Sequence, residues 1–465
     1  MKASSSRPTA AERGCAGPAL VAVRLAIVYA LYVVLGGSPS SASAAPPPPL
    51  RLGIEVGSSW LGGDLLVDAV PTLEFASRRL QIGLGAPLRL RVHDADPKDS
   101  CATPGLRCQD WDRWSDWTRL LRHLDIGDSR DAYQLHVGDL TGVTLGHGEL
   151  LWRYYNNQLF DEWNPGVYLT AQQRDWGFSA VMRNALEWSM AAARASGKPV
   201  TRGWWRSLEF GVQAAVERRS RGVVSDIPAG GWRFYQGLSG EPQINVVLDL
   251  SQPLLSGQGW LLGSWLAGGV QGVDQPALGG HFGLRLHAAS ATRSLAITAE
   301  GRVGEPGYLP ARFDPSYELT LGGARTTPSP VSGAQWGGRG SLEMSASGIG
   351  RTVLAWDQFG DARQRGHLWL FSNLSRDWSL RLYASANFLS SDAARRLGPA
   401  LIPGYPDQPD WQGFLSGRFR VQGPWYFSAS AGRRWFWRTG VYSGDYHPQR
   451  AETEVRIALG WDGGS

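Results

Sequence analysis

The stretch TLGHGELLWRYYNNQLFDEWNPG, residues 144–166, brings together side chains that are capable of chemistry. His147 lies between two glycines, Glu149 follows two residues later, and Asp161 lies further along. A histidine with carboxylates can bind a metal ion or act as a general acid and base. The spacing is diagnostic of neither role, and a histidine at a turn or rim is the commoner explanation. We therefore predict no catalytic residue, no metal site and no cofactor.

A lipid hydrolase is the sharpest enzymatic alternative. Outer-membrane phospholipase A carries a histidine, a serine two residues later and then Asn-Gly, whereas this chain has Glu149 at the serine position. No serine occurs between Ser129 and Ser179, and the chain has no G-x-S-x-G elbow. A serine from elsewhere in the fold remains an alternative, because triads are recognised by geometry and not by order.

The same stretch carries aromatic rings and amides that suit ligand binding. The rings offer faces for a sugar or another ring-shaped ligand, and the amides offer paired hydrogen-bond donors and acceptors. Gly146 and Gly148 predict a sharp bend in a strand. An ordinary long loop, ending in the turn at residues 164–166, is the alternative. The candidate ligand-binding residues are His147, Tyr154, Tyr155, Asn156, Asn157 and Trp163.

The first 44 residues have the features of an export signal. A leader ends at Arg24, and the apolar run LAIVYALYVVL follows at residues 25–35. The small-x-small site Ala42-Ser43-Ala44 comes next, as signal peptidase requires. This apolar run is too short to cross a bilayer, which takes about 20 residues. We expect a signal peptide over 1–44 and a mature barrel over 45–465; an uncleaved anchor is the alternative.

Two of the three cysteines remain after export. Cys15 lies in the leader, whereas Cys101 and Cys108 lie in CATPGLRC. An exported chain meets oxidising conditions, so we predict a disulfide between Cys101 and Cys108. Two free thiols, or half of a metal site, are the alternatives.

A helix is predicted directly after these cysteines. In DWDRWSDWTRLLRHLDIGD, apolar residues recur at spacings of three and four from Trp111 to Leu124, which is typical of one face of an amphipathic helix. Asp110 is a plausible cap and Gly127 a plausible stop. We expect residues 93–130 to form a disulfide-stapled helical insertion that acts as a plug, as a rim element, as an interfacial helix or as cover for a strand edge.

The rest of the chain alternates apolar and polar residues with period two. In WSLRLYASANF, residues 378–388, Leu380 and Leu382 share one face while Ser379 and Arg381 share the other. The predicted strands include those near 51–58, 64–75, 78–92, 131–138, 166–182, 206–217, 242–250, 259–268, 279–288, 366–373, 378–388, 412–421, 425–435 and 451–461.

The connections between these strands alternate between short turns and long loops. A transmembrane barrel has this order, because tight turns lie on the periplasmic side and longer loops face outward. Strands that are apolar outside satisfy their backbone in lipid only when they close. The sequence therefore predicts an all-β fold, a closed antiparallel transmembrane β-barrel of about 16 to 18 strands in the bacterial outer membrane.

Charge narrows the expected partners. The formal net charge is +5, of which the leader contributes +3, and no lysine or arginine run is present, so nucleic acid is excluded. The polar faces of the strands carry excess arginine, which would favour anions in an open lumen; arginine–glutamate networks that fill a closed lumen are the alternative. The candidate lumen-lining residues are Arg285, Glu300, Arg302, Arg381, Arg418, Arg420, Arg434 and Arg456.

Two runs resemble a known group of proteins. DWDRWSDWTRLLRHLDIGD and LHVGDLTGVTLGHGELLWRYYNNQLFDEWNPGVYL are similar to myxobacterial outer-membrane barrel proteins with a TLGHG motif. The resemblance covers residues 105–185 and implies the localisation but no activity. The continuation DEWNPG departs from the shorter Asp-His-type continuation of that group.

These observations favour a pore or passive transport-type protein of unknown substrate. The alternatives are a surface barrel that binds glycan or lipid, similar to capsule-anchoring lectins, and an outer-membrane lipid hydrolase. The expected partners are outer-membrane lipids, the barrel-assembly machinery, and a glycan or small solute.

Overall fold

The computed structural model describes residues 50–463, apart from 62, 95–104, 106, 108–109, 112–113, 129–130, 158–162, 187–188, 201, 219–220, 225–233, 238–241, 273–275, 316, 318–332, 348, 360–362, 376–377, 389–410 and 440–445. The predicted signal peptide, Cys101, Cys108 and Asp161 lie outside the described residues.

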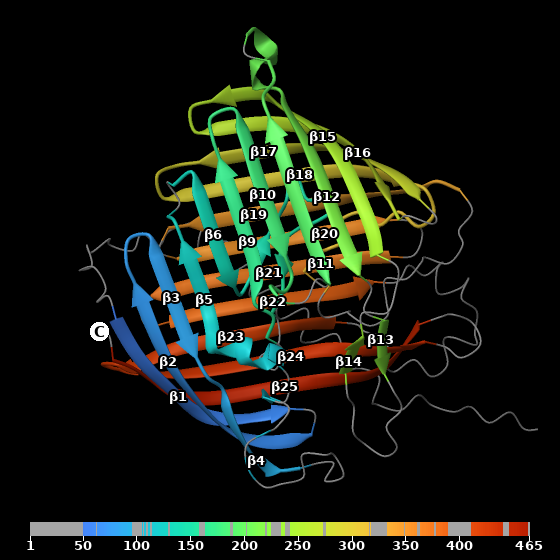
Figure 1. The fold of residues 1–465 in the computed structure, drawn as a ribbon. Coiled ribbons are helices and arrows are strands. Elements are labelled where there is room, and N and C mark those ends of the chain that lie inside the picture. The colour runs from blue at the N-terminus through green and yellow to red at the C-terminus, as the bar shows by residue number, and fades with distance from the viewer. Residues whose placement is uncertain are drawn as a thin grey trace, which may run out of the picture.

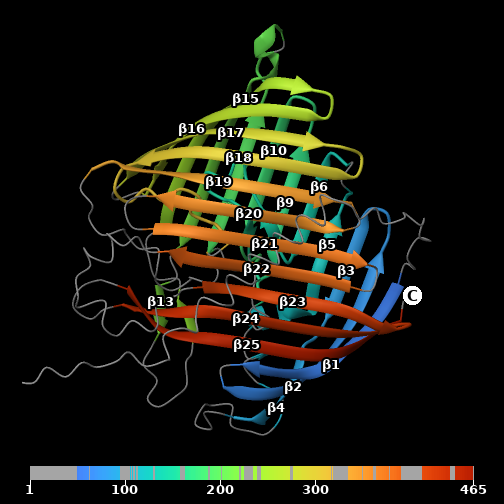
Figure 2. The same cartoon turned by 180° about the vertical axis from the view of Figure 1, so that it is seen from behind.

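One antiparallel sheet of 21 strands curls into a barrel (Figures 1 and 2). Its strands, in chain order, are β1 (Leu50–Leu61), β2 (Asp64–Ala76), β3 (Leu80–Gly85), β4 (Leu88–His93), β5 (Leu121–Ile126), β6 (Tyr133–Gly138), β9 (Gly166–Gln172), β10 (Trp176–Met182), β11 (Met190–Gly197), β12 (Glu209–Arg218), β15 (Pro242–Gly257), β16 (Trp260–Gln271), β17 (Ala277–Ala289), β18 (Arg293–Gly304), β19 (Gln335–Ala346), β20 (Gly350–Phe359), β21 (Arg363–Ser375), β22 (Trp378–Phe388), β23 (Trp411–Gln422), β24 (Trp425–Thr439) and β25 (Tyr446–Asp462). Two small pairs, β7 (Thr141–Val143) with β8 (Tyr154–Tyr155) and β13 (Arg221–Val224) with β14 (Phe234–Gly237), stand apart from it.

The first and last strands close the wall. β1 pairs with β25 from Gly53 to Trp60, and Figure 1 shows the blue β1 beside the red β25. β3 and β4 pair with opposite halves of β2 and share one position, so the 21 strands occupy 20 positions. The outer edge of β4 is bonded to a loop instead of a strand, since Arg91 N donates to Gly105 O at 3.1 Å. Pairing between strands therefore closes the barrel except along this outer edge of β4.

The expected strand number of 16 to 18 is wrong, because one predicted strand is a hairpin, β11 was missed, and β5 lies where a helix was expected. The range predicted as one strand over 166–182 is the hairpin β9–β10, which turns at residues 173–175. β11, MAAARASG, was missed because its outward side chains are alanines, which give no clear contrast with the inward ones.

The wall turns apolar side chains outward and polar ones inward. In β12, Phe210, Val212 and Val216 are exposed, whereas Gln213 and Glu217 are buried. Exposed tryptophans lie near strand ends, where membrane interfaces place them: Trp60, Trp176, Trp260, Trp336 and Trp425. A closed ladder with an apolar exterior is the form in which strands cross a membrane.

The connections alternate around the barrel as predicted. One rim, the short-turn rim, carries mostly short links, at 77–79, 127–132, 173–175, 198–208, 258–259, 290–292, 347–349, 376–377 and 423–424. The opposite rim, the long-loop rim, carries the longest links, at 94–120, 139–165, 219–241, 305–334 and 389–410. β1 begins and β25 ends at the short-turn rim.

The amphipathic helix predicted over residues 110–127 does not form. Trp114–Leu120 forms the 3-10 helix η3, and the following residues are strand β5. β5 pairs with β3 and β6, so the sheet's hydrogen bonds prevail over the local helical periodicity. Another 3-10 helix, η4, spans Trp204–Ser207. Within the described ranges no helix is long and apolar enough to cross a membrane.

Candidate functional site

Two loops from the long-loop rim fold into the barrel lumen. The first luminal segment, residues 139–157, follows β6 and contains the pair β7–β8. The second, residues 305–315 with Tyr317, follows β18. Both contact inward-facing residues of the wall: Glu149 accepts a hydrogen bond from Gln213 at 2.8 Å, and Arg312 Nε lies 2.6 Å from Glu217. We call the two segments together the plug.

The two luminal segments are bonded to each other through their backbones. Ala311 N donates to Glu149 O at 2.7 Å, and Phe313 N donates to Leu150 O at 2.9 Å. Trp152 N donates back to Phe313 O at 3.0 Å. The plug is therefore one unit built from two distant parts of the sequence.

The plug packs against opposite walls of the barrel. Toward β10–β16 it buries an apolar cluster that includes Leu150, Leu151 and Phe313, all at most 1% exposed. Toward β20 and β21, Trp152 and its neighbours pack on wall residues that include Val353, Ala355 and Trp369. Burying each large apolar side chain contributes about 1.5–3 kcal/mol, so these contacts hold the plug across the lumen.

Arg339 of β19 joins the wall to the first luminal segment. Its Nη2 donates to His147 O at 3.0 Å, and its guanidinium carbon lies 4.4 Å from the centre of the Trp152 ring. The same guanidinium lies 2.5 Å from the Glu300 carboxylate. The charge-assisted pair with Glu300 thus fixes the side chain of Arg339, which in turn binds the backbone carbonyl of His147 in the plug.

Glu300 is the centre of a buried polar network that also reaches the second luminal segment. Arg302 Nε lies 2.9 Å from Glu300 and its Nη1 lies 2.7 Å from Asp357. His281 Nδ1 lies 2.6 Å from Glu300, and its Nε2 lies 2.6 Å from the hydroxyl of Tyr308 in the plug. Buried charges need such partners, because an unpaired one is strongly destabilising.

His147 lies in a stacked, buried environment. Its ring lies 4.8 Å from that of Trp265 at an interplanar angle of 11°, and its Nε2 has no hydrogen-bond partner among the described residues. Burial lowers the pKa of His147 to about 4, so the ring is neutral near pH 7. Burial also raises the pKa of Glu149, whose carboxylate accepts the His147 backbone N–H at 3.1 Å. A serine hydrolase requires a serine hydroxyl against its histidine nitrogen, and no described serine hydroxyl lies against His147 Nε2.

The glycines around His147 lie in a turn and not in the predicted strand. Gly146 has φ +58° and Gly148 has φ +92°, a region that other residues rarely adopt. A Cβ on Gly146 would lie 2.4 Å from Gln213 Nε2. The TLGHG motif therefore lets the backbone turn and approach the wall closely.

Asn156 caps three strands that end early. Its Nδ2 contacts the carbonyls of Gly138, Asn164 and Arg183 at 3.0, 2.5 and 3.3 Å. Its Oδ1 accepts from Leu140 N at 2.6 Å. These groups belong to the ends of β6, β9 and β10 or adjoin them, so one side chain replaces ladder bonds that would otherwise be missing.

The other candidate ligand-binding residues also have partners inside the fold. The Tyr154 ring contacts that of Tyr317 edge-on at 6.1 Å, and the Tyr155 ring contacts that of Phe414 at 6.4 Å. Asn157 accepts from Asn164 N at 2.7 Å. Trp163 Nε1 donates to Thr118 O at 3.0 Å. The geometry favours a structural role for this set, and ligand binding by it stays a prediction.

The candidate lumen residues are distributed over several sites. Glu300 and Arg302 belong to the buried network. Arg456 lies 3.0 Å from Glu55 and 3.3 Å from Asp68, while Arg418 lies over the Tyr426 ring. Arg420 shares the face of Arg418, two residues away. Arg285 lies on the inward face of β17 and is exposed. The side chains of Arg381 and Arg434 lie outside the described part of the chain.

Sequence reasoning missed the second luminal segment and Arg153. Arg153 and Ala311 both have φ +49° and are the only non-glycine residues with positive φ in the described ranges. Both lie in the plug, and such a conformation costs about 1–3 kcal/mol. Arg153 forms an ion pair with Glu343 of β19. The signal available was the mixture of aromatic and charged residues in GYLPARFDPSY, which is unusual for a solvated loop.

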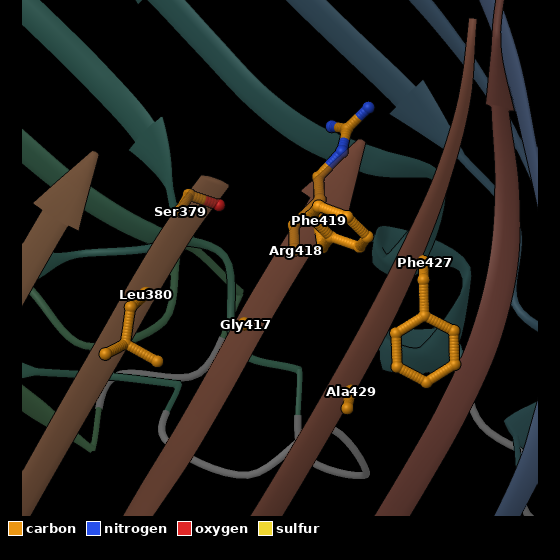
Figure 3. Close-up of a pocket in the computed structure, with 7 residues that line it drawn as sticks. All are labelled: Ser379, Leu380, Gly417, Arg418, Phe419, Phe427 and Ala429. Atoms are coloured by element: carbon orange, nitrogen blue, oxygen red, sulfur yellow. The ribbon is translucent and has the colours of Figure 1, made fainter. Parts of the chain in front are cut away.

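A hollow on the outer face belongs to the lipid-facing surface. It lies over β22–β24, and Gly417 forms its floor between Leu380, Phe419 and Phe427 (Figure 3). The hollow exists because Gly417 has no side chain. Ala429, Ser379 and Arg418 complete its lining.

Comparison with known proteins gives structural similarity only. No family model matches the sequence. No curated protein matches it either. OccK11 (OpdR) of Pseudomonas aeruginosa aligns over 89% of this chain and 95% of its own, with 10% identity and a TM-score of 0.31. OccD3 (OpdP) of the same organism aligns over 93% and 97%, with 9% identity and a TM-score of 0.30. A point mutant of its ferric enterobactin receptor, PfeA, aligns over 90% and 81%, with 10% identity and a TM-score of 0.34. These scores are too low to carry an assignment.

The chain's own architecture gives its localisation. A nearly closed antiparallel ladder, an apolar exterior, alternating rims and an even number of wall positions are together the features of a bacterial outer-membrane barrel. The chain is an integral β-barrel protein of the bacterial outer membrane.

Proposed function

We propose that the protein is an outer-membrane transport protein whose lumen is obstructed by the plug, and that a solute passes only when the plug moves. The observation that carries this proposal is the plug's contact with both walls. Leu151 packs toward β10–β16 while Trp152, the next residue, packs toward β20 and β21. A segment that touches both walls blocks free passage between them.

The contacts of the plug suggest which part moves. The stem of the plug, where Asn156 meets the strand ends, is held by neutral hydrogen bonds from Asn156 to backbone carbonyls. The tip of the plug, from His147 to Arg153, is held by ion pairs and charge-assisted bonds, in which Arg153 binds Glu343 and Arg339 binds His147 O. The Arg153–Glu343 pair keeps some exposure to water, so it is more open to competition by charged solutes and by salt than the fully buried Arg339 contact or the neutral amide contacts are. The proposal therefore has the tip swing away from a fixed stem.

Conductance in a planar bilayer tests the obstruction. Leu151→Asp places a carboxylate in the dry contact, where an uncompensated polar group costs roughly 2–7 kcal/mol. Leu151 belongs to the plug and not to a barrel strand, so the strands of the barrel stay paired while the tip of the plug leaves its contact with the wall. We expect small or rare conductance steps in the wild type and large steps in the variant.

Leu186→Asp is the matched control, because Leu186 lies in the link between β10 and β11 and is 48% exposed. It should behave as the wild type does. Heat-modifiable migration on gels must show that all three proteins are folded. Large, steady conductance in the wild type would sink the proposal, and so would an unchanged Leu151→Asp variant that is folded.

A further inference from the structure

Positive charge is in excess on the side of the plug that faces the short-turn rim. Glu343 lies 2.6 Å from Arg351 and forms an ion pair with Arg153. Arg285 of β17 pairs with Thr298 of β18, which pairs with Ser341 of β19, so Arg285 lies in the same sector of the wall as Glu343. The guanidinium groups of Arg153 and Arg351 thus share one carboxylate, and the guanidinium of Arg285 adds a third positive charge on the same inner face.

Arg285 is free to take a ligand. It alternates with Phe282, Leu284 and Leu286, which are exposed on the outer face, and shares the inner face with His281. No hydrogen bond or ion pair holds it within the described part of the chain. Its exposure is therefore exposure to water in the lumen.

Arg351 is also accessible, because 47% of its side chain is exposed. It follows the turn 347–349 at the short-turn rim, and Arg285 lies four residues before the end of β17 at the same rim. A solute that enters from this rim meets both arginines before it meets the plug.

We propose that Arg153, Arg285 and Arg351 form a binding site for a small, multiply charged oxyanion, a carboxylate or a phosphate. Guanidinium groups present planar pairs of N–H donors that match the oxygens of either anion. The net charge of the cluster, with Glu343 included, favours a ligand with at least two negative charges. Arg153 has a backbone conformation, φ +49°, that residues other than glycine rarely adopt.

Binding at this site is linked to the plug. An anion that bridges Arg153 and Arg351 takes the place of Glu343, and the ion pair between Arg153 and Glu343 is one of the contacts that hold the tip. This consequence rests on the proposed function, whereas the binding itself does not.

Isothermal titration calorimetry on the purified protein in detergent tests the site. Citrate and inorganic phosphate are titrated separately at constant ionic strength. We expect Arg285→Gln to weaken binding about tenfold or more, since a charge-assisted contact is lost. The double variant Arg285→Gln, Arg351→Gln should show no binding. Binding of citrate alone identifies a carboxylate site, and binding of phosphate alone identifies a phosphate site.

Two further variants keep the test specific. Glu343→Gln removes the internal competitor and should tighten binding, a change opposite in sign to general damage. Arg174→Gln, in the exposed turn 173–175, is the matched control and should leave binding unchanged. Undiminished binding in the double variant, or no binding of either anion by the wild type, overturns the site. Because calorimetry requires no flow through the barrel, its failure is distinguishable from failure of the conductance test.

Discussion

The side-chain amide of Asn156 donates a 3.0 Å hydrogen bond to the carbonyl oxygen of Gly138, the last residue of β6. Through this bond the plug and the wall complete each other. β6 stops after six residues because the chain turns into the lumen, and Asn156 returns from the lumen to satisfy the backbone left at that point.

Asn156→Ala should destabilise the plug stem. The substitution leaves several buried backbone groups without partners, and each such group costs about 1–3 kcal/mol. We expect a lower temperature for the heat-modifiable gel transition and faster hydrogen exchange in residues 133–145.

Asn245→Ala is the matched control, because Asn245 is fully buried in the lumen wall yet has no hydrogen-bond partner among the residues described. It should change the transition little. Equal losses in the two variants would mean that any buried asparagine in the lumen has this effect, contrary to the capping role.

Gly146→Ala should displace the plug tip. A methyl group there meets Gln213 at 2.4 Å, and the left-handed backbone adds about 1–2 kcal/mol of strain. Gly423→Ala has a similar positive φ, +54°, but open space around it, so it separates strain from collision. Conductance should rise in Gly146→Ala and stay unchanged in Gly423→Ala. A folded Gly146→Ala protein with wild-type conductance would contradict this.

The plug should loosen on acidification through His147. Burial holds its pKa at about 4 in the folded state, against about 6.5 in an unfolded chain. Between these two pH values, the state in which the plug is released binds more protons than the plugged state does. The free energy that holds the plug in the lumen is therefore fully present above about pH 6.5 and decreases as the pH falls toward 4. Conductance should increase when the pH is lowered from about 7 to about 4.5, and His147→Gln should flatten that increase.

Glu149 faces the same turn and titrates in the opposite sense. Burial raises its pKa, so it favours the folded state at low pH and opposes the effect of His147. The His147→Gln comparison should therefore be repeated in a Glu149→Gln background. In the Glu149→Gln background with His147 intact, conductance should rise more steeply on acidification than it does in the wild type. A flatter rise would refute the assignment of the pH effect to His147.

Much of the barrel wall was predictable because period-two alternation is a local property. The strand in TEVRIALGW carries Val455, Ile457 and Leu459 on its outer face, and all three are exposed as an apolar exterior requires. The alternation of short and long links was predictable for the same reason. The helix over residues 110–127 was wrong, because the partners that make Leu121–Ile126 a strand lie elsewhere in the sequence.

The sequence by itself determined the class of fold and the direction in which the strands face, since each follows from neighbouring residues. Only the tertiary structure decided the role of TLGHGELLWRYYNN. Its glycines, Asn156 and Trp152 acquire their functions from Gln213, Gly138 and Arg339, which belong to different strands of the wall. It also decided that residues 305–317 join this stretch, because a bond such as Phe313 N to Leu150 O depends on how the barrel closes and leaves no pattern in either segment.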